Sequence, residues 1–137
     1  MLDDQVRELA SGPNFAAFTT LLPSGRFATQ IMWVGCDDEH LLINTEVHRQ
    51  KYKNVTRDPR VTVTIWEAQR PVRYAEARGR VIDTVTGPRA REHIDELARK
   101  YNGRPYPDQA ITSERVILVI EPERQRVWDL GRDVVSR

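Results

Sequence analysis

Alternating apolar and polar positions predict most of the strands in this chain. Residues 61–66 alternate β-branched and other apolar side chains with threonine, a pattern typical of a half-buried strand. Further strands are predicted at 15–22, 27–35, 40–45, 72–86, 114–121 and 124–130. Pro23-Ser24-Gly25-Arg26 predicts a hairpin turn between the first two, and Gly79 predicts a bulge in the long strand.

Helical patterns occur in three short segments. Gly12-Pro13 ends a predicted helix at 3–11, and Pro88 begins an amphipathic helix at 88–101. Between them, a short basic helix follows the strand that ends at Thr45. Consecutive hairpins without βαβ alternation favour a mainly β (α+β) fold, an antiparallel barrel with two or three peripheral helices. The length of 137 residues predicts a single domain over 1–137.

Composition narrows the classes of partner and compartment. A net charge of +1 provides no general attraction for nucleic acid or anionic membranes, so we expect neither as a partner. The single Cys36 excludes an internal disulfide and is consistent with a reducing cytoplasm. We also expect no signal peptide, because the acidic start lacks an apolar segment after it, and no apolar run approaches the ~20 residues of a membrane helix.

Several familiar catalytic and binding motifs are missing. The chain has no GxGxxG, GxxxxGK[ST], HExxH or GxSxG pattern. His40, His48 and His93 lie on different predicted elements, where packing or surface roles are favoured, and we expect no metal site. No pair of carboxylates can be assigned as general acid and general base, so no catalytic residue is assigned.

The basic helix is the strongest candidate for binding an anion. Its cations crowd the first turns, where free backbone N–H groups and the helix dipole also favour negative charge; they are Arg49, Lys51, Lys53 and Arg57. The alternative is a solvated basic face. Trp33, on a strand whose neighbour leads into this helix, is a candidate wall for a flat ring, although a core position would also explain a tryptophan.

Several segments together resemble one family. Residues 19–26 are similar to its T-L-x-P-D-G hairpin, 49–61 to its G-R-x-K-x-R-N-L-R-R-D-P-R-V signature, and 73–80 to its R-Y-x-E-x-R-G element. This is the split β-barrel flavin/deazaflavin superfamily of the FMN-binding type, typified by pyridoxamine 5′-phosphate oxidase (the PPOX class). The chain looks most like its group that uses the deazaflavin coenzyme F420. It departs from the pattern at His48, Lys53 and Val55, where Gly, Arg and Leu are usual.

The resemblance implies a homodimer with the cofactor in a groove between its subunits. Arg49 and Lys51 would bind the phosphate and acidic tail, with Gln50 and Asn54 supporting them. The other implied cofactor-binding residues are Asn44 and Thr45 along the groove, Gln30, Ile31, Met32 and Trp33 facing the ring, and Tyr74 closing it.

The implied reaction is hydride transfer from reduced F420 to a conjugated acceptor such as an enone, a coumarin-like lactone, a quinone or a biliverdin-like tetrapyrrole. An FMN-dependent oxidase or reductase and a non-catalytic F420 carrier are the alternatives. Tyr101 or Tyr106 could supply a proton in such a reaction, as could solvent.

Overall fold

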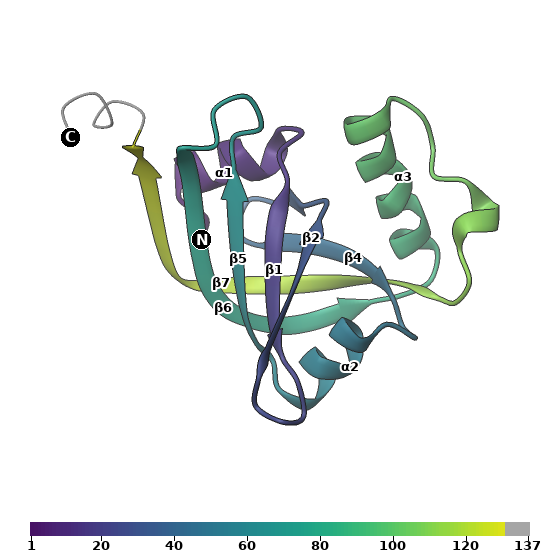
Figure 1. Cartoon of the computed structure of the whole chain (residues 1–137). Coiled ribbons are helices and arrows are strands. Elements are labelled where there is room, and N and C mark those ends of the chain that lie inside the picture. The colour runs from purple at the N-terminus through teal and green to yellow at the C-terminus, as the bar shows by residue number, and fades with distance from the viewer. Residues whose placement is uncertain (131–137) are drawn as a thin grey trace.

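One curled antiparallel sheet forms the body of the protein, for which a computed structural model describes residues 1–130. Its seven strands follow the order β2-β1-β5-β6-β7-β4-β3 (Figure 1). Their bounds are β1 Ala16–Leu21, β2 Phe27–Met32, β3 Gly35–Cys36, β4 Leu41–Glu46, β5 Arg60–Trp66, β6 Arg73–Val85 and β7 Arg115–Asp129. The helices are α1 Asp4–Ser11, α2 Gln50–Arg57 and α3 Pro88–Asn102, with a 3₁₀ turn, η1, at Asp108–Ala110. The predicted split antiparallel barrel with peripheral helices is confirmed.

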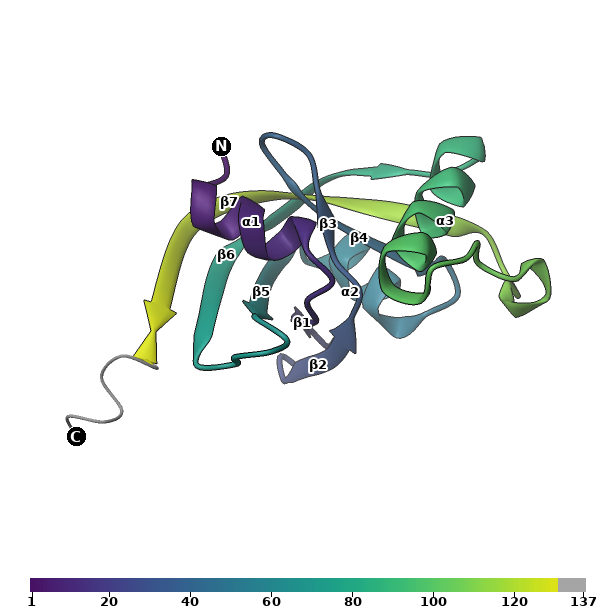
Figure 2. The same cartoon turned by 90° about the horizontal axis from the view of Figure 1, so that it is seen from above.

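The three helices occupy different sides of the barrel. α1 and α2 lie at its opposite ends (Figure 1), and β7 runs from α3 at its start to beyond α1 at its end (Figure 2). α1 buries Val6 and Leu9 against the core, which also contains Leu2, Phe18 and Leu118. Within residues 1–130, no helix is long and apolar enough to cross a membrane.

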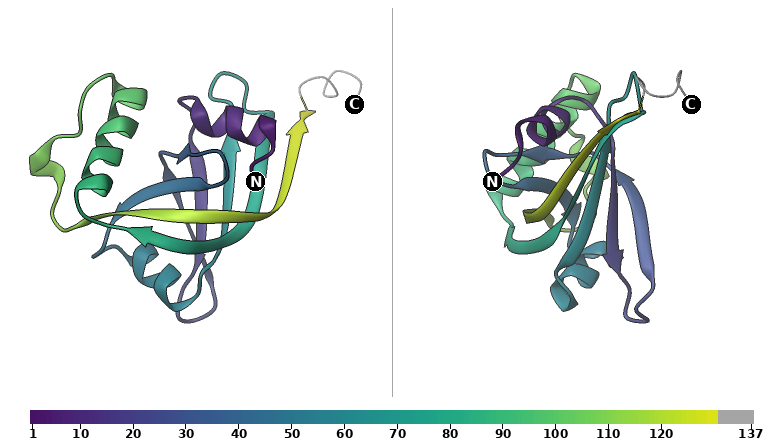
Figure 3. Two further views of the ribbon diagram at one scale, coloured as in Figure 1. Left: turned by 180° about the vertical axis from the view of Figure 1, so that it is seen from behind. Right: turned by 90° about the vertical axis from the view of Figure 1, so that its left-hand side faces the viewer.

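The long strands β6 and β7 give the barrel its curvature. Both bend near their middle (Figure 3), where the pairing shifts register between Arg78 and Gly79. The predicted bulge at Gly79 is therefore present, and its cause is steric. A Cβ at Gly79 would lie 2.0 Å from the carbonyl oxygen of Glu121, so only glycine allows β7 to approach this closely.

Two strand predictions were wrong in their boundaries. Segments 114–121 and 124–130 are one strand, β7, because Pro122 pairs with Gly79 at the bulge and does not form a turn. Segment 27–35 is divided: β2 ends at Met32 and pairs with β1, whereas Gly35–Cys36 pairs with β4. This change of partner directs the connecting residues towards α3.

A buried asparagine seats α2 on the barrel. Asn54 donates from Nδ2 to Thr20 Oγ1 of β1 (3.0 Å), and its Oδ1 accepts from Gln50 Nε2 (2.8 Å). Val55 packs beside it in the core. The predicted basic helix therefore exists, and its amino-terminal end is fixed relative to the sheet.

Candidate functional site

A pocket of about 330 Å³ lies between the end of β2, strand β4, the start of β7 and α3. We call it the β2–α3 pocket. Its walls are mainly apolar and aromatic, with two polar side chains; the lining residues are Phe15, Ile31, Met32, Trp33, Asn44, Ile94, Leu97, Tyr106 and Arg115. Such a combination of apolar walls and a few polar groups is typical of a ligand site for a flat ring.

Aromatic stacking holds Trp33 in the pocket wall. Its ring lies parallel to that of Tyr101, with centroids 5.1 Å apart, and meets the edge of Tyr106 at 6.3 Å. The Tyr101 hydroxyl accepts from the Val34 N–H (3.1 Å) and donates to the carbonyl oxygen of Asn14. Tyr101 therefore fastens the wall, and its proton is already engaged by the backbone.

Arg115 and Asn44 form the polar part of the pocket. Arg115 Nε donates to Asn44 Oδ1 (2.8 Å), and the guanidinium lies 5.3 Å from the centroid of the Tyr106 ring. The Asn44 amide donates to the carbonyl oxygen of Ala90 and to Nδ1 of His93, both at 3.0 Å. Each of these partners fixes which way the Asn44 amide faces, so the polar wall is rigid.

His93 accepts this hydrogen bond as a neutral ring. Burial lowers its pKa to about 4, and the nearby charges of Arg89, Lys100 and Arg115 act in the same direction, against the opposing effect of Glu96. A neutral His93 can accept at Nδ1 and keep its proton at Nε2.

Glu46 connects the β2–α3 pocket to the basic helix. Its side chain is 1% exposed, and its Oε1 accepts from the backbone N–H groups of Thr112 (2.8 Å) and Ser113 (2.6 Å). The other oxygen lies 3.3 Å from Arg115 Nη1 and 4.0 Å from Arg49 Nη2. Burial by itself would raise the pKa of Glu46, but the two N–H donors and Arg115 outweigh it, so the pKa is lowered and the carboxylate stays charged.

Arg49 and Arg115 share this one carboxylate, and Lys51 lies close enough to both to feel their charges. Burial lowers the pKa of Lys51, and the positive charges of Arg49 and Arg115 lower it further, so the three side chains act on one another. Arg49, Lys51 and Arg115 together with Glu46 form what we call the cation cluster. Its surplus of positive charge beside an aromatic pocket suits a ligand that combines a flat ring with an anionic group.

The structure brings together only part of the predicted site. Ile31, Met32, Trp33 and Asn44 line the pocket, and Arg49 and Lys51 belong to the cation cluster. Gln50 and Asn54 bond to each other in α2.

The remaining predicted residues lie away from the pocket. Gln30 is exposed on β2, and Thr45 is buried next to Asn44, on the opposite face of β4. Tyr74 stacks on Trp128 with centroids 5.0 Å apart. The cofactor contacts of all the predicted residues, those that line the pocket included, stay predictions.

Sequence reasoning missed Arg115 and Glu46. Each is a charged residue at one end of a mainly apolar strand, where a surface position would be the ordinary expectation. The only signal was their position: Glu46 directly follows Asn44 and Thr45, and Arg115 directly precedes residues 116–120. Their antiparallel pairing, Glu46 opposite Arg115, needed the sheet register.

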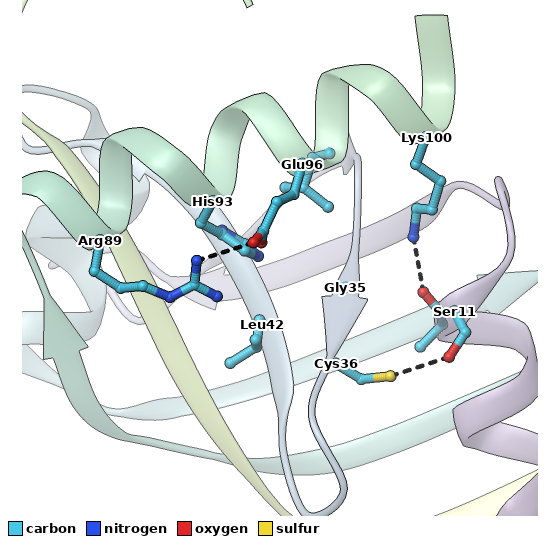
Figure 4. A pocket seen from close by; sticks show the side chains of 10 residues that line it. Ser11, Gly35, Cys36, Leu42, Arg89, His93, Glu96 and Lys100 are labelled. Carbon is cyan, nitrogen blue, oxygen red and sulfur yellow. Dashed lines mark hydrogen bonds and ion pairs between the residues drawn. The ribbon is translucent and has the colours of Figure 1, made fainter. Parts of the chain in front are cut away.

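A second pocket, of about 260 Å³, lies between α1, β3 and α3 (Figure 4). Its side chains are mostly engaged with their neighbours. Lys100 Nζ donates to the carbonyl oxygens of Ala10 (2.9 Å) and Val34 (2.6 Å), and Ser11 Oγ lies 3.3 Å from Cys36 Sγ. Burial lowers the pKa of Lys100 to about 8. These contacts fasten α3 to α1 and β3, and the β2–α3 pocket is the better candidate site.

Comparison with known proteins places this geometry in a family. The family described as pyridoxamine 5′-phosphate oxidase matches residues 2–129. The chain therefore belongs to the pyridoxamine 5′-phosphate oxidase family, whose fold is the split barrel seen here. A search of curated proteins gave no match. Within residues 1–130, no group of three or more His, Cys, Asp or Glu side chains could hold a metal ion.

Solved structures extend this comparison. A protein named F420 reductase is 30% identical with a TM-score of 0.77, the match covering 91% of this chain and 98% of that one. A conserved hypothetical protein from Mycobacterium tuberculosis is 25% identical with a TM-score of 0.73, covering 96% and 88%. General stress protein 26 from Bacillus anthracis, 15% identical with a TM-score of 0.67 over 92% of each chain, shares the fold alone.

Proposed function

We propose that the protein is an oxidoreductase that uses reduced coenzyme F420 to deliver a hydride to conjugated small-molecule acceptors. Enones, lactones, quinones and biliverdin-like tetrapyrroles are the acceptor classes we expect. The observation that carries the proposal is the cation cluster beside the aromatic β2–α3 pocket. The 30% identity to a protein named F420 reductase supports the choice of coenzyme.

The available side chains fit the two ends of this coenzyme. Ile31, Met32 and Trp33 would contact the flat ring, and Arg49 and Lys51 would bind the phosphate and the acidic tail. The bound coenzyme supplies the hydride chemistry, so the protein has to bind, orient and exclude water. FMN has a phosphate but no acidic tail and would use fewer cations, which makes it the alternative coenzyme.

We also propose that the protein works as a homodimer in the cytoplasm, where the free Cys36 stays reduced. The support for a dimer comes from β2, whose face bearing Phe27 and Ile31 leaves these side chains 77% and 60% exposed. Ile31 also lines the β2–α3 pocket, so a second copy placed on this face would cover the pocket as well.

Titration of the cofactor-free protein with F420 and, separately, with FMN tests the proposal directly. We expect F420 to bind more tightly, and Arg49→Ala and Lys51→Ala each to weaken its binding by roughly 1–3 kcal/mol through loss of charge-assisted bonds. The matched control is Arg99→Ala, an exposed cation on α3. Calorimetry or ring fluorescence measures the affinities.

The possible results separate the alternatives. Tighter binding of FMN would move the protein to the FMN branch of the family. Full F420 affinity in both the Arg49 and Lys51 variants would contradict the anion site. Tight F420 binding without turnover of any activated alkene, lactone, quinone or tetrapyrrole in a panel would favour a carrier.

A further inference from the structure

Arg115 is a nearly buried cation that faces a mainly apolar and aromatic pocket. Its side chain is 9% exposed and forms part of the wall of the β2–α3 pocket. The residues that line this pocket include no Asp or Glu. Burial lowers the pKa of Arg115 without removing its charge, which Glu46 helps to retain. A guanidinium buried at such a place requires partners for all its donors.

Two of its three nitrogens are already committed. Nε donates to Asn44 Oδ1 at 2.8 Å, and Nη1 lies 3.3 Å from Glu46 Oε2. Within residues 1–130, Nη2 forms no hydrogen bond. Because Arg115 lines the β2–α3 pocket, Nη2 is the guanidinium nitrogen that remains for a ligand there.

The orientation of this free donor is fixed. Asn44 and Glu46 hold two different nitrogens of the guanidinium, and its central carbon lies 5.3 Å from the centroid of the Tyr106 ring. A planar group held at two of its nitrogens presents the N–H donors of the third in a fixed direction, at little cost in side-chain entropy when a ligand binds.

The charge at this position is only partly neutralised. Glu46 is shared with Arg49, whose Nη2 lies 4.0 Å from the same oxygen, and Lys51 adds a third positive charge. A negatively charged oxygen in the pocket would therefore meet both a free donor and a positive potential, which strengthen each other where water is excluded.

We propose that Arg115 binds a negatively charged carbonyl-type oxygen on a flat conjugated ring in the β2–α3 pocket. Resting on the proposed function, this assigns Arg115 the recognition of ring oxygens and leaves the phosphate and acidic tail to Arg49 and Lys51. The ring oxygen can come from two sources, the carbonyl edge of the coenzyme or the carbonyl of the acceptor. Both offer the same chemistry to the guanidinium.

The experiment compares an ionised ring with its neutral analogue. Isothermal titration calorimetry of the cofactor-free protein at neutral pH would use 4-hydroxycoumarin, which is anionic there, and coumarin, which is not. We expect the wild type to bind the anion roughly tenfold more tightly or better, as one charged hydrogen bond allows. Arg115→Met should remove this preference and leave coumarin affinity within about twofold, because the apolar walls are unchanged.

Two further variants control for structure and charge. Arg99→Met removes an exposed cation on α3 and should keep the full preference. Arg115→Lys keeps the charge but cannot hold Asn44 and Glu46 while presenting a planar donor, so it should lose most of the preference. Circular dichroism establishes that each variant is folded, and the Lys variant provides the result if Arg115→Met does not fold.

The same variants titrated with F420 and FMN identify the source of the oxygen. A tenfold or greater loss of coenzyme affinity in Arg115→Met would assign the contact to the coenzyme, and unchanged coenzyme affinity would assign it to the acceptor. Equal binding of anion and neutral ring by the wild type would overturn the proposal. Failure of F420 and FMN to bind, with the anion preference intact, would overturn the proposed function and not the role of Arg115.

Discussion

At the scale of single residues, His93 is a neutral ring in a cationic environment. Because burial and neighbouring cations lower its pKa to about 4, the unfolded chain binds a proton below pH 6.5 that the folded chain does not bind. Stability should therefore fall as the pH decreases from about 6.5 to about 4, by up to roughly 3 kcal/mol from this group.

Urea unfolding at a series of pH values tests this expectation. His93→Asn keeps an acceptor for Asn44 and cannot titrate, so its free energy of unfolding should vary less over that interval. His40→Asn is the matched control, since His40 lies beside the carboxylates of Asp37 and Glu121 at 3.2 Å. An unchanged pH profile in His93→Asn would show that another group controls acid stability.

The sequence could predict which residues line the pocket where a local pattern or a family motif included them. Trp33 directly follows β2 and Asn44 lies on β4, the strand before the basic helix; the strand order pointed to the first and the family resemblance to the second, and both line the pocket. Arg115 could not be predicted in this way, because its partner Asn44 is 71 positions away and the contact depends on the β4–β7 register. His93 was expected to be a packing or surface histidine, and it is buried.

At the scale of elements, Asn54 fixes α2 on the barrel and thereby positions Arg49 and Lys51. Asn54→Ala would leave Thr20 Oγ1 and the Gln50 amide without their partner, so we expect a loss of about 1–3 kcal/mol in the free energy of unfolding. Coenzyme affinity should also fall, because the amino-terminal end of α2 would no longer be fixed. Thermal or urea unfolding and coenzyme titration measure the two effects.

Thr56→Ala is the control on the same helix. Thr56 is exposed, and its hydroxyl donates to the backbone carbonyl of Lys53, so its loss should change stability little. Equal stability and coenzyme affinity for Asn54→Ala and the wild type would mean that the remaining contacts of α2 are sufficient to seat it.

Elements were predicted well where their interior pattern was regular and less well at irregular points. The alternation in β5 and the helical spacing in α3 each identified their element. Segments 114–121 and 124–130 were predicted as two strands, but the bulge opposite Gly79 accommodates Pro122, which has no N–H, inside one continuous strand. Such a compensation lies in the partner strand, so a local pattern does not reveal it.

At the scale of the whole molecule, the run of hairpins was sufficient to predict antiparallel pairing, whereas the way the sheet closes was not available from local patterns. The two edge strands, β2 and β3, follow each other directly in sequence yet occupy opposite ends of the sheet order. β2 consequently keeps an exposed apolar face, and an unpaired edge with apolar side chains favours association with another copy.

Replacement of Phe27 by Asp tests whether this face joins two copies. If β2 forms the dimer interface, burying a carboxylate there would be costly, and Phe27→Asp should shift the protein from dimer to monomer in sedimentation or light-scattering measurements. F420 affinity should fall when the dimer dissociates, because the face that carries Phe27 continues through Ile31 into the β2–α3 pocket.

Ile82→Asp is the matched control, because Ile82 is also a large apolar residue and is 50% exposed on β6. Dissociation caused by Ile82→Asp alone would place the interface on β6, and a monomeric wild type with full F420 affinity would show that one chain forms the whole site.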